Sequence, residues 1–169
     1  MKSKSSESNL LKGIIAGTVG GLAAALVMNQ YQALTAKLGE NDQPKKSSNE
    51  KPEPATVKAA EMVAEKVFDR ELKKSEKEPA GAAMHYLMGG VSGAIYGAAA
   101  ELTGATTFAA GLPFGSAVWA VADEVVIPAL GLSKSPSEYP LSAQAYALSS
   151  HWVYGLVTEM VRKAVRKAL

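Results

Sequence analysis

Two series of glycines at four-residue spacing constrain the fold of this chain more than any other feature. The series are Gly13, Gly17 and Gly21, and Gly89, Gly93 and Gly97. In water, a glycine inside a helix costs about 1 kcal/mol relative to alanine, so three in one helix would be a poor design for a soluble protein. In a bilayer, small residues at this spacing let helix backbones approach closely and pack by dispersion. The two series therefore favour helices that pack against one another within a membrane.

Charged residues are strongly segregated along the chain. Residues 37–78 carry ten Lys or Arg and ten Asp or Glu, which is more than half of all the charged residues. Four other stretches carry none, and they are residues 13–36, 79–100, 102–122 and 139–158. Each is about 20 residues or longer, the helical length that spans a hydrocarbon core of ~30 Å. We therefore expect an all-α fold, a polytopic membrane helix bundle with about four spans; a soluble bundle rich in alanine and glycine is the alternative.

The charge pattern also divides the chain into three parts. We expect an N-terminal stub and first spanning helix at 1–38, a charged linker and amphipathic helix inserted between spans one and two at 39–78, and three further spans with a basic tail at 79–169. Within these parts, helices are expected at 10–38, 56–74, 80–102, 107–130 and 141–166.

The inserted helix carries local signals of its own. We expect Thr56 as its N-cap, an i,i+4 ion pair between Asp69 and Lys73, and Pro79 as the first residue of the following helix. Its apolar face is expected to consist of Ala60, Val63, Ala64, Val67, Phe68 and Leu72. Such a helix docks on its own bundle or on a protein partner, or lies on the membrane surface. Its other face mixes charges of both signs, so we favour protein docking by the 55–78 segment.

Lysine and arginine bias sets the expected orientation. Three lysines lie in residues 1–12, and the C-terminal tail carries four basic residues with almost no acid. An even number of spans then places both termini on the cytoplasmic side. The ten basic residues of 37–78 would face outward in this arrangement, which conflicts with the rule. The first apolar run is too long for a signal peptide, so we interpret it as a retained spanning helix.

Small residues at four-residue spacing occur in every expected span and lead each time to a polar residue. The glycines expected at helix interfaces are Gly13, Gly17, Gly21, Gly89, Gly93, Gly97, Gly111, Gly115 and Gly155. Close helix packing is the main interpretation, and a glycine-lined pore or groove is the alternative. Residues 95–102 and 153–160 also share one pattern, apolar–Tyr–Gly–x–x–small–Glu–apolar, which hints at a duplicated two-helix unit.

Ionisable residues within the expected spans form a candidate intramembrane polar layer. They are His85, Glu101, Asp123, Glu124, His151 and Glu159. Such groups are costly in a membrane, so each is a functional hypothesis. His151 paired with Asp123 or Glu124 across helices would be a structural hydrogen bond or a proton-relay step. Glu101 and Glu159 lie near helix ends, where an interfacial position explains them, and Glu159 can pair with the basic residues three and four positions later.

Several classes of function find no support in the sequence. There is no cysteine, no phosphate-binding or nucleophile motif, and no Glu-x-x-His pair typical of carboxylate-bridged metals. Basic residues are not interleaved with aromatic ones, as nucleic-acid binding would favour. We therefore expect no catalytic residue, no metal, no cofactor and no nucleic acid. The expected partners are the lipid bilayer, with a homo-oligomer and a protein partner at the 55–78 helix as open possibilities.

The chain resembles the YagU-like inner-membrane proteins of bacteria, a group of largely uncharacterised function. The resemblance rests on Gly-Ile-Ile-Ala-Gly at 13–17, His85, Tyr96, Ala100-Glu101, Pro-Ala-Leu-Gly-Leu at 128–132, Ser150-His151-x-Val153 and Glu159-x-Val161-Arg162-Lys163. It covers most of the chain except 40–78, and Asp123-Glu124 departs from the family pattern. The resemblance implies a small multi-span protein of the bacterial inner membrane and supplies no reaction.

Two functions follow as hypotheses. The first is a non-enzymatic structural or stress-related membrane protein with Gly/Ala-packed helices. The second is a small transporter or a proton- or ion-conducting protein that uses the intramembrane acidic and histidine residues.

Overall fold

The computed structural model describes residues 2–39, 53–103 and 105–169, and this part of the chain is helical apart from short loops. Its long helices are α1 (Lys2–Gly39), α3 (Lys74–Thr103) and α6 (Leu141–Ala168). Its shorter elements are α2 (Ala55–Phe68), the 3-10 segment η2 (Ala105–Gly111), α4 (Leu112–Val118), the π-helix η3 (Trp119–Val126), α5 (Ile127–Ala129) and the 3-10 turn η4 (Pro136–Glu138). No strand occurs among the described residues, which confirms the all-α class. Most of the linker expected in the first part of the 39–78 segment falls outside the described residues.

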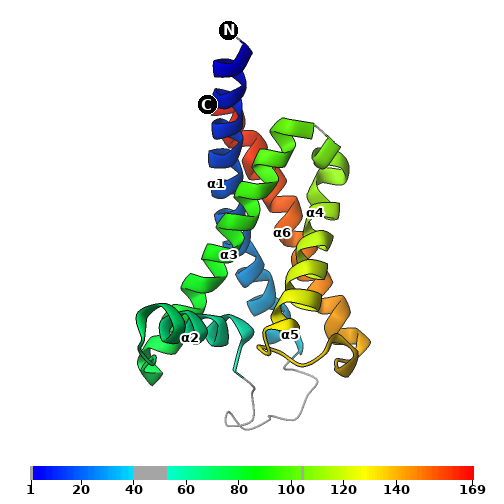
Figure 1. The fold of residues 1–169 in the computed structure, drawn as a ribbon. Helices are drawn as coiled ribbons and strands as arrows, with labels where there is room; N and C mark the ends of the chain where they lie inside the picture. The colour runs from blue at the N-terminus through cyan, green and yellow to red at the C-terminus, as the bar shows by residue number, and fades with distance from the viewer. Residues whose placement is uncertain (1, 40–52, 104) are drawn as a thin grey trace.

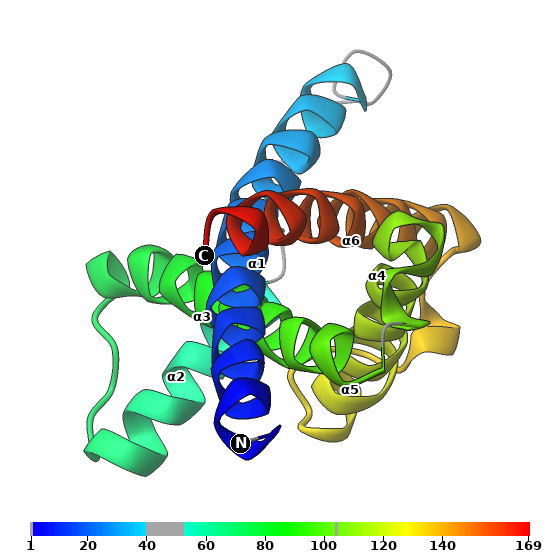
Figure 2. The same cartoon turned by 90° about the horizontal axis from the view of Figure 1, so that it is seen from above.

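The helices form an antiparallel bundle. α4, η3 and α5 follow one another without a break and act as one helical column, which runs antiparallel to α6 as α1 does to α3 (Figure 1). α1 packs against both α3 and α6, and α4 packs against α6. Seen from above, α1 crosses α6 and α3, while the α4–α5 column lies farther from α1 (Figure 2).

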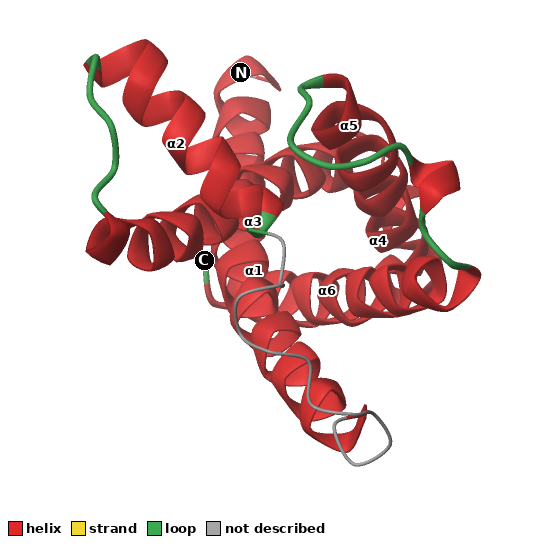
Figure 3. Ribbon diagram, turned by 90° about the horizontal axis from the view of Figure 1, so that it is seen from below, coloured by secondary structure: helices red, strands yellow, loops and turns green. Residues whose placement is uncertain are grey.

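The bundle has two distinct ends. Both chain termini lie at one of them, called here the terminal end (Figure 1). There the Lys12 ammonium donates a hydrogen bond of 2.6 Å to the carbonyl oxygen of Leu169. The loops between α2 and α3 and between α5 and α6 lie at the opposite end, called here the α2 end (Figure 3). α2 packs against the first part of α3 and buries Val57, Ala60 and Ala64.

α1 and α3 meet backbone to backbone along their glycines. A Cβ atom placed on Gly17 would lie 2.8 Å from the Cα of Gly97, and one on Gly21 would lie 3.0 Å from the Cα of Gly93. One on Gly13 would lie 2.7 Å from the carbonyl oxygen of Gly97. Real side chains do not tolerate such distances, so any larger residue at these positions would push the two helices apart.

α4 and α6 repeat this contact with the second set of glycines. A Cβ on Gly155 would lie 3.0 Å from the Cα of Gly115, and one on Gly111 would lie 2.9 Å from the carbonyl carbon of Gly155. Gly155 therefore meets Gly111 and Gly115 as Gly97 meets Gly13 and Gly17. The hint of a duplicated two-helix unit thus has a structural counterpart in the pairs α1–α3 and α4–α6.

The inserted helix is shorter than the sequence predicts. It ends at Phe68 because Asp69 adopts a left-handed conformation with φ of 49°. Leu72 and Lys73 therefore lie beyond the helix, and the predicted Asp69–Lys73 pair on one helical face was wrong. The predicted N-cap was also wrong, because Pro54 occupies that position and its carbonyl accepts the backbone N–H of Val57 at 3.0 Å.

The helix that follows begins earlier than predicted. α3 starts at Lys74, and Pro79 lies inside it rather than opening it. Glu76 in the first turn provides the reason, because its carboxylate accepts the backbone N–H of Lys73 at 2.9 Å and the Arg70 guanidinium at 3.1 Å. These bonds satisfy a free donor at the helix start and connect the loop after α2 to the helix.

The third predicted span also needs correction at its start. Ala109, Ala110 and Gly111 all have positive φ, so the regular helix begins at Leu112 and not at 107. Its end agrees with the predicted end at residue 130. Gly131 has φ of 71°, and the Leu132 N–H bonds to the Ile127 carbonyl at 3.1 Å, which is a Schellman ending.

Two helical stretches, Asn9–Leu38 and Thr107–Ala129, are long and apolar enough to cross a membrane. The criterion uses length and composition only, and the core helix of a soluble protein or a signal sequence near the N-terminus also meets it. The charge-free parts of α3 and α6 do not reach the same apolarity because alanine, glycine and polar residues dilute them.

Candidate functional site

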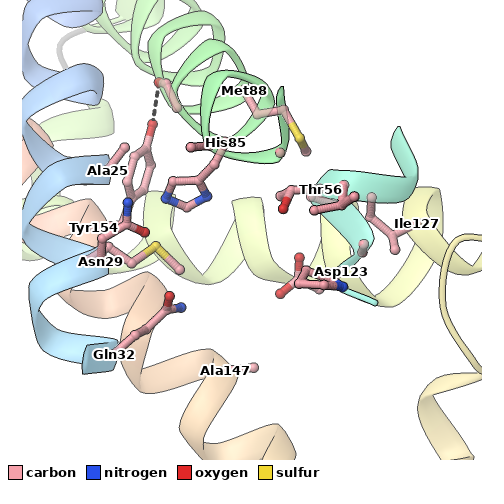
Figure 4. A pocket seen from close by; sticks show the side chains of 18 of the residues that line it. Ala25, Asn29, Gln32, Thr56, His85, Met88, Asp123, Ile127, Ala147 and Tyr154 are labelled. Carbon is pink, nitrogen blue, oxygen red and sulfur yellow. Dashed lines mark hydrogen bonds between the residues drawn. The ribbon is translucent and has the colours of Figure 1, made fainter. Parts of the chain in front are cut away.

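A cavity of about 880 Å³ lies in the half of the bundle nearest the α2 end. Residues of α1, α3, η3 and α6 form its walls, and the start of α2 lies at its edge (Figure 4). The α4–α5 column and α3 do not pack closely at this level, whereas α1 and α3 do. The cavity is therefore space between the two helix pairs rather than within one of them.

Asp123 of η3 and His151 of α6 lie next to each other in the wall of this cavity. The Asp123 carboxylate lies 3.8 Å from His151 Nδ1. That nitrogen also lies 2.9 Å from the carbonyl oxygen of Ala147 one turn earlier. Because a carbonyl can only accept, Nδ1 of His151 carries a proton and Nε2 holds the lone pair in the neutral ring. The His151 side chain is 10% exposed, while that of Asp123 is 40% exposed.

His85 approaches the same cavity from α3 (Figure 4). Its Nε2 atom is buried and has no hydrogen-bond partner, which is uncommon because buried polar atoms are nearly always paired. The ring packs edge-on against Tyr86, with centroids 5.9 Å apart. An unpaired buried nitrogen beside an open volume marks a position where a bound molecule can complete the bonding.

The rest of the wall combines amides, hydroxyls and apolar side chains. Asn29 and Gln32 come from α1, and Asn29 donates a hydrogen bond of 3.4 Å to the hydroxyl of Tyr86. The Tyr154 hydroxyl donates a buried bond of 2.6 Å to the Gly89 carbonyl and so connects α6 to α3 (Figure 4). The wall residues on α3 reach no farther towards the terminal end than Ser92.

Charged side chains at the α2 end form the rim of the cavity. The Lys77 ammonium pairs with Glu61 at 2.5 Å and with Glu53 at 3.1 Å, which ties α2 and the residue preceding Pro54 to α3. These two bonds raise the pKa of Lys77, the bond to Glu61 most of all. Gly81 permits the contact, because a Cβ there would lie 3.2 Å from the Cα of Val57.

Glu159 and Glu101 lie in a separate cluster near the terminal end. The Arg162 guanidinium donates to both carboxylate oxygens of Glu159, at 2.7 and 3.1 Å, and Lys163 pairs with the same carboxylate at 2.9 Å. This confirms the pairing expected from the i+3 and i+4 spacing. Glu159 is 1% exposed and Arg162 5%, so both members of the pair are buried.

Glu101 belongs to the same cluster through a contact that the sequence analysis did not predict. Arg166 of α6 binds the Glu101 carboxylate of α3 at 2.7 and 3.2 Å, and it also donates to the Asn9 side chain of α1 at 3.1 Å. Arg162 lies 5.8 Å from the centre of the Tyr96 ring, a cation–π contact. The cluster pairs two carboxylates with three basic side chains and joins three helices, which is the arrangement of a structural ion-pair network.

Glu124 belongs to neither group. Its carboxylate accepts a hydrogen bond of 3.3 Å from the Gln144 side chain of α6, and it does not line the cavity. The π-helical turns of η3 set the directions of Asp123 and Glu124, and only Asp123 faces the cavity. The six residues predicted as one polar layer are therefore divided, with His85, Asp123 and His151 at the cavity and Glu101 and Glu159 in the ion-pair cluster.

The cavity can bind and hold protons or cationic groups. Asp123 supplies a carboxylate, and two imidazoles supply ring nitrogens that can donate or accept a hydrogen bond. Among the described residues, no group of three or more His, Cys, Asp or Glu side chains is placed to hold a metal ion. Asn29 was not predicted as a site residue; it ends the series of small residues at four-residue spacing on α1 that continues from Gly21 through Ala25, and that spacing is the signal that could have indicated it.

The comparisons with known proteins add a family without a known role. A family model described as "Protein of unknown function (DUF1440)" matches residues 34–160. No curated protein and no solved structure matches the chain. The matched range includes residues 40–78, which lie outside the resemblance to the YagU-like proteins, and it begins after the glycine motif at 13–17.

Proposed function

We propose a role for this chain, which belongs to the DUF1440 family of proteins of unknown function, as a small four-span integral membrane protein without enzymatic activity. The observation that carries the proposal is the distribution of side chains around the bundle. Glycines fill the helix interfaces, whereas large apolar residues project outward. On α3, for example, Leu87, Val91 and Ile95 are 59%, 52% and 65% exposed. A surface of this kind suits lipid better than water.

The lengths of the less apolar helices agree with this proposal. The charge-free part of α3, residues 79–100, is about 33 Å long at a rise of 1.5 Å per residue. The charge-free part of α6, residues 141–158, is about 27 Å long by the same measure. Both are close to the thickness of a hydrocarbon core. α3 packs directly on α1, so the two would cross the bilayer together.

Orientation and location follow as further parts of the proposal. The two termini lie at the same end of the bundle, as an even number of spans requires (Figure 1). That end also carries the basic residues of α6, which favours the cytoplasmic side. The resemblance to the YagU-like proteins adds the bacterial inner membrane as the location.

Cysteine accessibility tests this arrangement directly, because the natural chain has no cysteine. Ser137 in the α5–α6 loop and Lys167 near the C-terminus are both exposed and lie at opposite ends of the bundle. In intact cells, a membrane-impermeant maleimide should label Ser137→Cys, while Lys167→Cys should react only after lysis. Labelling of both variants in intact cells, or recovery of the protein in the soluble fraction, would overturn the proposal.

A second function is favoured by one observation, the cavity with its three ionisable side chains. A cavity that opens towards one end of a membrane bundle is the form expected of a small transporter or ion pathway in one of its states. Proteoliposomes test this alternative. If it holds, Asp123→Asn should abolish proton or cation flux and Glu124→Gln should preserve it. Equal flux in empty liposomes, the unchanged protein and both variants would eliminate transport and leave the first proposal intact.

A further inference from the structure

We propose that the cavity is a binding site for a small organic cation, an ammonium group on a compact apolar body, with Asp123 as its counter-ion. The proposal goes beyond a structural role in the membrane and does not require transport. Its basis is the charge, the hydrogen-bonding capacity and the shape of the cavity wall.

The deep part of the cavity carries a single formal charge. The charged residues of the whole wall are Glu53, Lys74, Lys77, Glu78 and Asp123. All except Asp123 belong to the rim at the α2 end, and Lys77 is already paired with two carboxylates. Asp123 pairs with the imidazole of His151 at 3.8 Å, which is beyond hydrogen-bond distance, and it also interacts electrostatically with Glu124 and His85. The interior is therefore negative and its carboxylate is open to a charge-assisted partner.

The imidazole of His151 adds an acceptor rather than a donor. Nδ1 of His151 donates to the Ala147 carbonyl, so Nε2 of the neutral ring is an acceptor. The His85 ring also lies in the wall, and its Nε2 is buried without a hydrogen-bond partner. A carboxylate and a ring acceptor select a ligand that donates hydrogen bonds, as an ammonium group does.

The remaining wall selects an organic cation over an inorganic one. Hard metal cations require several oxygen ligands, and the described residues contain no cluster of three metal-binding side chains. Apolar side chains make up much of the wall instead, among them Met28, Met88, Val118 and Ile127. The volume of about 880 Å³ lies within the range of small-molecule sites. A compact apolar body would fill it, and a hydrated ion would leave these side chains in contact with water.

Fluorine NMR with a matched set of probes tests the proposal on the full chain in lipid nanodiscs. The probes are 4-fluorobenzylammonium, the neutral 4-fluorobenzyl alcohol and the anionic 4-fluorobenzoate, with empty nanodiscs to subtract partitioning into lipid. We expect a saturable change in the ammonium signal. The alcohol should bind about tenfold more weakly because it lacks the charge-assisted bond, and the benzoate should not bind.

Two neighbouring acids supply the matched variants. Asp123→Asn should weaken binding of 4-fluorobenzylammonium by about tenfold or more. Glu124→Gln should leave it unchanged, because Glu124 does not line the cavity. Ala82→Phe, at an exposed wall position, should weaken binding by occupying space without touching the carboxylate. The proposal fails if the unchanged protein shows no saturable ammonium signal, if the alcohol binds equally well, if Asp123→Asn retains full affinity, or if Ala82→Phe does.

Discussion

At the scale of single residues, two glutamates at the same end of the bundle are held in different ways. Glu159 is buried with Arg162, and the side chains of both are at most 6% exposed. Glu101 binds Arg166 with side-chain exposures of 17% and 27%. Removing one partner of a buried pair leaves an uncompensated buried charge, whereas a more exposed pair is screened by solvent.

We predict that Glu159→Gln lowers the free energy of unfolding by about 3 kcal/mol. The matched variant Glu101→Gln should lower it by about 1 kcal/mol or less. Denaturant titration of the purified protein in detergent, followed by circular dichroism, measures both. Equal losses for the two variants would mean that burial of the Glu159–Arg162 pair does not govern its contribution.

The same residues show what sequence can and cannot supply at this scale. The pairing of Glu159 with residues three and four positions later follows from helix geometry alone, because those side chains lie on one face. The pairing of Glu101 with Arg166 joins positions 65 residues apart on different helices. No local pattern encodes such a contact, and only the packing of α3 against its neighbours brings it about.

At the scale of helices, the glycine contacts differ in what they can tolerate. A Cβ on Gly93 would meet the backbone of α1, with the Cα of Gly21 at 2.8 Å. A Cβ on Gly90, on the same helix, would first meet the end of the Leu22 side chain at 3.2 Å. A side chain can rotate away, whereas a helix backbone can only be displaced as a whole.

Alanine substitutions at these two glycines should therefore have opposite effects. Gly93→Ala should destabilise the protein by about 2 kcal/mol through overpacking. Gly90→Ala should be neutral or stabilise it by up to about 1 kcal/mol through helix propensity. Thermal unfolding in one detergent compares them, and a spin-label distance between α1 and α3 should increase only for Gly93→Ala. A stable Gly93→Ala with an unchanged distance would contradict close backbone packing.

α2 is predicted to stay docked on α3 only within a pH window. The pKa of Glu76 is lowered by its bond from the Lys73 backbone and by Arg70, so its contribution is present above the ordinary value of 4.5 and is lost as pH falls through the lower, folded-state value. The pKa of Lys77 is raised by Glu61 and Glu53, so its contribution is present below 10.5 and is lost as pH rises through the higher value.

A spin label on α2 reports this window. Val67 is 68% exposed, so Val67→Cys can carry a label without disturbing the contact with α3. The label should gain mobility at both the acid and the alkaline limits. In a protein that carries both Val67→Cys and Lys77→Met, the label should already be mobile at neutral pH, or its mobility should no longer rise at alkaline pH. A label that keeps one mobility across the whole range in both proteins would show that these ion pairs do not hold α2.

The cavity arises where the second helix pair departs from the first. When Gly111 is aligned with Gly13, Trp119 takes the place of Gly21. When Gly155 is aligned with Gly97, Ala147 takes the place of Gly89. An indole cannot replace a glycine at a backbone contact, and the π-helical segment η3 begins at Trp119. The sequence showed the shared glycines and the three ionisable residues. The sequence could not show that close packing of the second helix pair ends at Trp119, because a π-helical segment has no clear local signature.

At the scale of the whole molecule, α3 decides between a bundle with two membrane spans and one with four. α1 and the column that includes α4 are apolar enough to span by composition alone, whereas α3 is rich in glycine and alanine and is not. Composition underestimates such a helix, because its glycines are covered by α1 and never meet lipid. Its outward residues are what a bilayer would contact, and Val91 is 52% exposed among them.

Two valines that are both exposed provide a matched comparison, Val91 on α3 and Val67 on α2. If α3 spans the bilayer, a spin label at Val91→Cys should collide with oxygen, which concentrates in lipid, and be shielded from a water-soluble nickel reagent. The label at Val67→Cys should show the reverse, since Val67 lies one residue before the end of α2, near the charged first turn of α3 where Arg70 binds Glu76. Nanodiscs and power-saturation spectroscopy measure both collision rates. Equal access of the nickel reagent to the two sites would place α3 in water and restrict the membrane contact to α1 and the α4–α5 column.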